Sequence, residues 1–184
     1  MIATVADVSG VDASSVKLIA RYLREAGHIG QQSSGAGAAK MAVSDAAALL
    51  IGMNAASLAK DAVNAADEIG RLPLEYLTTL DKAHQRYADL HVHLADSANF
   101  FDALSYLLDF HGSDNDVSTV LEFRRPAVQI SLALWVEGSD DLNDRIAAAV
   151  YKPKTYNKDI IKDRILNVRI TEKTLRAVAN TLAN

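Results

Sequence analysis

Hydroxyl and basic side chains gather in one short segment near the beginning of the chain. Helical spacing places five residues on the solvent side of a helix expected from Asp12 to about Ala26, namely Ser14, Ser15, Lys17, Leu18 and Arg21. Serine, lysine and arginine side chains hydrogen-bond to base edges and neutralise phosphates when such a helix lies in the major groove of DNA. The chemistry that these residue types indicate is recognition of a nucleic acid.

The end of this helix and the segment after it add further polar groups. Arg24 lies in the last turn of the helix, and Gln31, Gln32 and Lys40 flank a Gly/Ser-rich stretch. Amide and ammonium groups of this kind are common partners of the DNA backbone and grooves. We therefore expect the DNA contacts to come from nine residues, Ser14, Ser15, Lys17, Leu18, Arg21, Arg24, Gln31, Gln32 and Lys40.

Two short helices and a tight turn must position these side chains. Residues Ile2 to Val8 predict a first helix, and Gly10 is able to take the positive φ that a sharp turn between helices needs. Asp12 is expected to cap the second helix, and Gly27 to follow its last turn. The inward side of the second helix is apolar, with Val16, Ile19, Leu23 and also Tyr22.

The spacing of small and apolar residues in this pair of helices resembles the helix-turn-helix family. That family typically has a small residue, a glycine four positions on, and a branched apolar residue six positions beyond, as in Ala6, Gly10 and Val16. Its other apolar positions are matched by Val5, Val11 and Ile19. The resemblance implies that the second helix reads double-stranded DNA. Such modules usually have a preceding helix, so another element or another subunit is expected to cover that side.

The stretch after the second helix predicts a wing. His28 to Gln31 and Lys40 to Ala42 are short candidate strands on either side of the loop 33–37. In winged relatives such a loop reaches the minor groove or the DNA backbone. A plain connector is the alternative. With the following apolar helix from Asp45 to Met53, which Ser44 is expected to cap, the DNA-binding domain is predicted to span residues 1–54.

The rest of the chain predicts a connecting helix over 55–73 and an assembly domain over 74–184. Gly70 to Pro73 marks the boundary between them. Helices are expected over Ala55–Ile69, Glu75–Ala95, Ala98–His111, Leu142–Val150 and Thr171–Leu182. A β-hairpin is predicted over Val117–Phe123 and Val128–Val136. A loop is predicted over Tyr151–Lys158, and the pattern of Ile160–Ile170 fits either a helix or a strand. The fold class is therefore α+β, mostly α, with a winged helix-turn-helix before a helical oligomerisation domain that carries a β-hairpin.

No pattern in the chain supports catalysis or a metal centre. His84 and His91 share one helical face, but His93 points elsewhere, so we interpret all three as structural. The acidic residues considered as ligands show no repeated spacing: Glu68, Glu75, Asp81, Asp89 and Asp102. There is no cysteine, phosphate-binding loop, zinc-protease motif or nucleophile elbow. We expect no catalytic residue, no metal ligand and no cofactor.

Charge is unevenly distributed along the chain. Residues 1–60 hold five Lys/Arg and four Asp/Glu, residues 61–150 hold six and sixteen, and residues 151–184 hold eight and three. This pattern favours DNA contact at one or both ends of the chain. The basic tail fits either a second phosphate-binding surface or neutralisation of the acidic middle. Arg124 and Arg125 fit either a phosphate or partner contact or ordinary turn charge.

The whole arrangement resembles the small terminase subunits of tailed bacteriophages. Those proteins join a helix-turn-helix to a helical oligomerisation core, form rings and deliver viral DNA to a packaging motor. The resemblance implies a non-catalytic protein that binds double-stranded DNA as a homo-oligomer and contacts a large terminase or motor subunit. The alternative is a dimeric transcription regulator, of phage or bacterial origin, that contacts the transcription machinery. A structural interaction module is a third class.

The sequence also predicts where the protein works. No apolar run approaches the ~18 residues that span a bilayer, and the first residues lack the regions of a signal peptide. We therefore expect a cytoplasmic protein without membrane contact.

Overall fold

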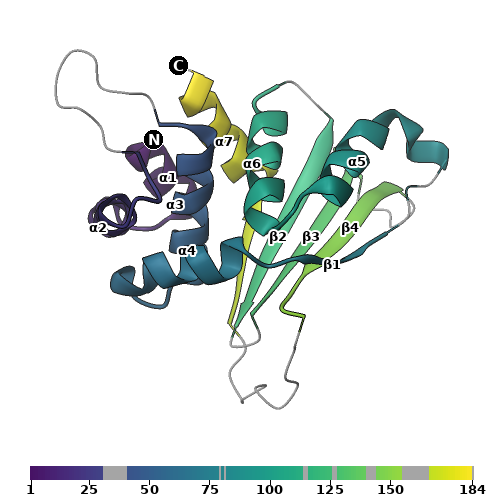
Figure 1. Ribbon diagram of the computed structural model, residues 1–184. Coiled ribbons are helices and arrows are strands. Elements are labelled where there is room, and N and C mark those ends of the chain that lie inside the picture. The colour runs from purple at the N-terminus through teal and green to yellow at the C-terminus, as the bar shows by residue number, and fades with distance from the viewer. Residues whose placement is uncertain are drawn as a thin grey trace.

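The chain folds into a layer of helices on one face of an antiparallel sheet (Figure 1). The computed structural model describes residues 1–30, 41–78, 80, 82–113, 116–125, 128–139, 144–154 and 166–183. Over these residues the predicted α+β class is confirmed, and 57% of them are helical. No helix among them is long and apolar enough to cross a membrane.

The helices and strands of the described residues follow one another in this order. The first part of the chain contains α1 (Ile2–Ser9), α2 (Ala13–Glu25), α3 (Val43–Ala55), η1 (Ala59–Asp61) and α4 (Ala62–Gly70). The second part contains β1 (Leu74–Leu77), η2 (Lys82–Tyr87), α5 (Ala88–Asp96), α6 (Phe100–His111), β2 (Val117–Arg125), β3 (Gln129–Val136), β4 (Arg145–Tyr151), β5 (Leu166–Thr171) and α7 (Glu172–Ala183).

The five strands form one sheet in the order β1-β4-β3-β2-β5. The predicted hairpin is confirmed, because β2 and β3 pair antiparallel in continuous register, with Thr119 opposite Leu134. β5 pairs with the side of β2 away from β3, so the described part of the segment that fitted either helix or strand, residues 166–170, is a strand. The last helix itself is confirmed as α7.

The helix predicted over Leu142–Val150 is wrong, because its described part forms β4. The run of Ala147, Ala148 and Ala149 suits a helix by intrinsic propensity. In the fold this run hydrogen-bonds to β3 on one side and β1 on the other. Pairing on both sides satisfies the backbone groups that a helix would have satisfied internally, so tertiary context overrides propensity.

The long helix predicted over Glu75–Ala95 is also wrong. Its first residues form β1, and Thr78 extends the pairing, because the Thr78 N–H donates to the Ala148 carbonyl at 2.9 Å. The Ala148 N–H donates in turn to Thr78 Oγ1 at 2.8 Å. His84 has φ −108° and ψ 19°, which interrupts helical geometry before α5 begins. The helix predicted over Ala55–Ile69 is likewise divided, into η1 and α4.

One continuous apolar core joins the helices to the inner face of the sheet. Phe100 at the start of α6 packs edge-on to Phe123 of β2, with ring centroids 5.8 Å apart, and lies 5.3 Å from the ring of Tyr151 in β4. All three side chains are buried. The predicted boundary at residues 70–73 falls where α4 ends and the chain crosses to β1, and the division into domains stays a prediction.

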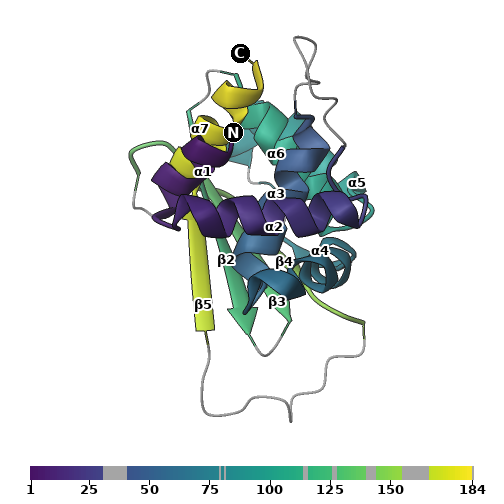
Figure 2. The same ribbon diagram turned by 90° about the vertical axis from the view of Figure 1, so that its left-hand side faces the viewer.

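The two ends of the described chain lie together. α7 packs against α1, and the hydroxyl of Thr181 donates to that of Thr4 at 3.1 Å. α3 packs against α2, which Figure 2 shows crossing in front of it. α7 therefore packs on α1, and α3 packs on α2. These two helices of the same chain cover the side of the module that a preceding helix usually covers.

Candidate nucleic-acid interface

The turn between α1 and α2 is fixed by a glycine and a serine. Gly10 has φ 66°, the left-handed conformation expected of it. The Ser9 hydroxyl donates to the Val5 carbonyl at 2.6 Å and accepts from the Val11 N–H at 3.3 Å. These contacts set the direction in which α2 leaves the turn.

Asp12 caps the beginning of α2, as the sequence predicts. Its Oδ2 accepts from the backbone N–H groups of Ser14 and Ser15 at 3.0 and 3.1 Å, and from the Ser14 hydroxyl. The Ser14 hydroxyl is the main cause that lowers the pKa of Asp12, followed by the backbone N–H of Ser15. The cap therefore holds both serines of the predicted DNA set at the first turn of the helix.

The other end of α2 is closed by Gly27, which has φ 83°. The N–H of His28 donates to the Leu23 carbonyl at 2.8 Å, and the N–H of Gly27 donates to the Arg24 carbonyl at 3.1 Å. This pair of bonds is the Schellman arrangement that ends many helices. Capping interactions at both ends therefore fix the first and last turns of α2.

The inward side of α2 is buried against the body of the protein. Its buried residues are Val16, Ile19, Ala20 and Leu23. Gly52 of α3 allows close approach, because a Cβ built on it would lie 3.0 Å from Cδ1 of Leu23. The orientation of α2, and so of its outer side, is fixed by this packing.

The outer side of α2 carries five of the predicted DNA-contacting residues. Ser14, Ser15, Lys17, Leu18 and Arg21 are all exposed. Leu18 is 42% exposed, which is normal for a single leucine on a protein surface. Arg24 is different, because it is half-buried and its Nε lies in the interior with no hydrogen-bond partner among the described residues.

One ion pair on this surface was not considered in the sequence interpretation. Arg21 Nε lies 2.7 Å from Glu25 Oε1, and both side chains are more than half exposed, at 69% and 54%. The separation of four residues is a signal that the sequence already contains. The guanidinium of Arg21 is thus held along the helix by a carboxylate that would face DNA phosphates.

The predicted wing falls mostly outside the described residues, as do Gln31, Gln32 and Lys40. The described ends, residues 28–30 and 41–42, contain no strand. Both ends are bound to one side chain, because the Gly30 N–H donates to Asp45 Oδ1 at 3.0 Å and the Ala42 N–H donates to Asp45 Oδ2 at 2.9 Å. Asp45 of α3 therefore holds Gly30 and Ala42 close to each other, beyond the end of α2.

The three histidines considered as ligands make separate contacts. His91 Nε2 donates to the Thr78 carbonyl at 2.7 Å, and His93 Nδ1 donates to the Asp89 carbonyl at 2.8 Å. His84 is buried, and the ring of His93 stacks on Tyr106 with centroids 4.3 Å apart. Among the described residues, no group of three or more His, Asp or Glu side chains could hold a metal ion.

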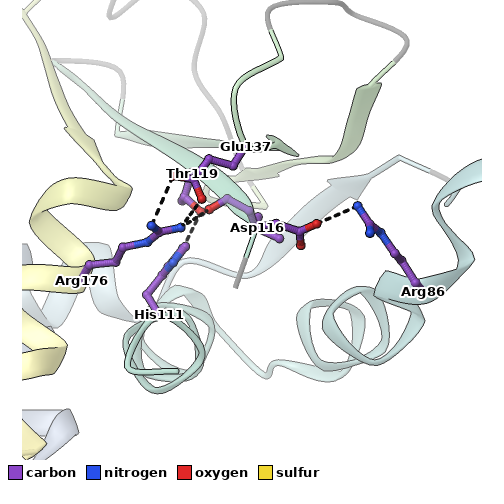
Figure 3. Close-up of polar contacts among 7 residues, drawn as sticks. Arg86, His111, Asp116, Thr119, Glu137 and Arg176 are labelled. Atoms are coloured by element: carbon purple, nitrogen blue, oxygen red, sulfur yellow. Dashed lines mark hydrogen bonds and ion pairs between the residues drawn. The ribbon is translucent and has the colours of Figure 1, made fainter. Parts of the chain in front are cut away.

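A further histidine lies in a polar cluster between α6, β2 and α7 (Figure 3). His111 Nε2 shares a 2.7 Å hydrogen bond with Thr119 Oγ1, while Arg176 lies 2.9 Å from Glu137 Oε2. Burial first, and then the positive charge of Arg176, lower the pKa of His111 to about 4 against the opposing effect of Glu137. Because His111 is only 1% exposed, it is a neutral structural group with no access for a substrate.

Basic residues of the tail pair with the acidic middle of the same chain. Lys152 Nζ lies 3.1 Å from Glu75 Oε1, and Arg176 binds Glu137. Arg169 binds Glu122, whose other carboxylate oxygen lies 3.6 Å from Arg124 Nη2. For these three described residues of the tail, the contacts favour internal neutralisation.

Comparison of the chain with family models, with curated proteins and with solved structures finds no match.

Proposed function

We propose that the protein binds double-stranded DNA without catalysis, through the outer side of α2. The observation that carries the proposal is a doubly capped helix whose inner side is buried and whose outer side presents Ser14, Ser15, Lys17, Leu18 and Arg21. An α-helix with its side chains is about 10–12 Å across and fits the major groove, which is about 12 Å wide, and the 13 residues of α2 extend for about 20 Å.

Each outer residue has a role that suits its chemistry. Ser14 and Ser15 lie at the amino end of α2, where Asp12 already accepts hydrogen bonds from both backbone N–H groups and from the Ser14 hydroxyl, so the Ser15 hydroxyl is the group proposed to reach a phosphate. Lys17 and Arg21, one turn apart, reach bases or flanking phosphates. Leu18, exposed between them, is placed to touch a thymine methyl group. Arg24 adds a further contact in this proposal, as do Gln31, Gln32 and Lys40, which lie outside the described residues.

The biological role depends on how many copies act together. Linked copies bind more tightly than one, because later contacts become intramolecular. A ring would favour the role of a phage small terminase subunit, which recognises viral DNA and contacts a large terminase or motor subunit. A dimer would favour a transcription regulator. Molar mass in solution separates these two roles.

A gel-shift titration with duplex DNA of mixed sequence at low salt tests the proposal. Lys17→Ala together with Arg21→Ala should weaken retention strongly. The matched control is Arg86→Ala with Lys154→Ala, which removes the same charge from exposed residues in η2 and after β4. Arg86 resembles Arg21, because it is also well exposed and pairs with an acidic residue, Asp116, at 2.7 Å. Equal retention of the two double variants would refute the assignment.

A further inference from the structure

A cavity of about 620 Å³ lies where the final turns of α6 and α7 meet the first turn of α3. Figure 1 shows these three helix ends at the same end of the molecule. Clefts that bind small molecules usually have volumes of about 300–1,000 Å³. The cavity is therefore large enough to hold an organic ligand.

Most of the cavity wall is apolar. The apolar and aromatic side chains that line it include Val43, Tyr106, Leu108, Phe110, Ala179 and Leu182. The ring of Tyr106 stacks on that of His93 with centroids 4.3 Å apart, and on that of Phe110 at 6.2 Å. Stacking holds the two lining rings in place, so the wall suits a ligand with a flat apolar body.

A carboxylate stands in this apolar wall. Among the described residues that line the cavity, Asp109 is the one with a charged side chain. Asp109 is exposed, and its carboxylate makes no ion pair or hydrogen bond with any residue that the structure describes. The group is therefore available to pair with a positively charged ligand.

The surroundings of the cavity add to its negative potential. Helix C-termini carry partial negative charge, and α6 and α7 both end at the cavity. α3 presents its N-terminus, but Asp45 in its first turn supplies an opposing negative charge. The pKa of Tyr106 is raised by burial first, and then by the negative charges of Asp89 and Asp109. These features favour a cation over an anion.

We propose that this cavity binds an amphipathic organic cation, a small molecule with a flat apolar body and one ammonium group. The ammonium pairs with Asp109 beside the rings of Tyr106 and Phe110, where cation–π attraction adds to the ion pair. The apolar body displaces water from the side chains of Leu108 and Leu182. A ligand that carries a carboxylate or phosphate is repelled by Asp109.

The cavity lies between the two helices that support the proposed DNA-binding pair. α7 packs against α1, and α3 packs against α2. A ligand held between α7 and α3 restrains both supports, which allows it to regulate DNA affinity, a consequence that rests on the proposed function. The tests of the cavity use no DNA, so either proposal can fail while the other stands.

A titration of the isotope-labelled full chain, followed by nuclear magnetic resonance, tests the proposal. The probes are naphthylmethylammonium and naphthylacetate, which share a ring system and differ in the sign of their charge. The amide signals of Gly112 and Ser113, which line the cavity, should shift and saturate with the cation. The signal of Gly138, in the turn after β3, should not move. The anion should bind about tenfold more weakly, because it loses both the ion pair and the cation–π attraction.

Two pairs of variants separate the carboxylate from the rings. Asp109→Asn should weaken binding of the cation about tenfold and remove its preference over the anion. Asp102→Asn is the matched control, because Asp102 is an exposed carboxylate on the same helix that lies outside the cavity wall. It should keep both the affinity and the preference. Tyr106→Leu should bind the cation several-fold more weakly, while Tyr106→Phe, which keeps an aromatic ring, should bind it as the natural chain does.

Three results would overturn the proposal. One is that the signals of Gly112 and Ser113 do not saturate with the cation at any concentration that dissolves. Another is equal affinity of the natural chain for the cation and the anion. The third is that Asp109→Asn binds the cation as tightly as Asp102→Asn does, which would assign the binding to the acidic surface in general.

Discussion

The Arg21–Glu25 pair places opposing charges on the surface proposed to meet DNA. The carboxylate of Glu25 holds the guanidinium at 2.7 Å and would repel nearby phosphates. Glu25→Gln should therefore tighten binding of duplex DNA several-fold at low salt, measured by fluorescence anisotropy. Glu75→Gln removes the same charge far from α2, where Glu75 pairs with Lys152, and should leave affinity unchanged. Weaker binding by Glu25→Gln would contradict the proposed position of Arg21.

His111 makes stability depend on pH. Its folded pKa of about 4 lies below the ordinary value of 6.5, so the unfolded chain takes up a proton at a higher pH than the folded protein does. Stability from this group is therefore complete above pH 6.5 and is lost as the pH falls toward 4. The loss should be about 2 kcal/mol at pH 5.

Urea unfolding at pH 7 and pH 5 measures this effect. His111→Gln keeps a polar group near Thr119 but does not titrate, so most of the pH dependence should disappear in that variant. His93→Gln, an exposed control on α5, should keep it. If the free energy of unfolding falls equally between pH 7 and pH 5 in His111→Gln and in the natural chain, another group causes the pH dependence.

The sequence predicts several individual residues well, because their roles are local. Gly10 and Asp12 act within a few residues of their own position, and periodicity alone separates the two sides of α2. Asp45 could not be found in this way, because it binds Gly30 across 15 positions. The partial burial of Arg24 depends on packing between helices, which periodicity does not describe.

At the level of elements, the contact between α2 and α3 depends on a glycine inside a helix. A Cβ on Gly52 would lie 3.0 Å from Leu23 Cδ1 and 3.3 Å from the Cβ of Ala62. Gly52→Ala gains about 1 kcal/mol of helix propensity but overpacks the core by about 1–3 kcal/mol. We expect a net loss of stability together with weaker DNA binding, since α2 must shift.

Gly70→Ala is the control for this prediction. At the end of α4 an added Cβ would meet Phe101 at 3.5 Å, an ordinary contact, so the variant should unfold at the same urea concentration or a higher one. A Gly52→Ala protein as stable as Gly70→Ala would show that α2 and α3 have more room than their packing indicates.

Elements that depend on distant partners were the ones that the sequence did not predict. The hairpin of β2 and β3 is local and was recognised. β4 is alanine-rich and β1 is short, and both are strands because they pair with each other across about 70 residues. Intrinsic propensity favours a helix for both segments, and it therefore predicts the long helix over Glu75–Ala95. Strand pairing in the folded protein overrides that propensity.

At the scale of the whole molecule, α7 connects the proposed DNA-binding helices to the sheet. It packs against α1 and α6 and continues directly from β5. Leu175 of α7 is fully buried, so Leu175→Ala should lower the free energy of unfolding by about 2–5 kcal/mol. Lys173→Ala, exposed on the same helix, should have little effect in the same urea titration. A loss below about 1 kcal/mol for Leu175→Ala would contradict the packing.

The most direct measurement of the central claim is the salt dependence of DNA binding. Each phosphate contact contributes about 0.9 to the slope of log K against log salt concentration. If Lys17 and Arg21 bind phosphates, Lys17→Ala with Arg21→Ala should bind more weakly and have a slope shallower by about two. Arg86→Ala with Lys154→Ala should keep the slope of the natural chain. Equal slopes for all three proteins on the same duplex would contradict binding through α2.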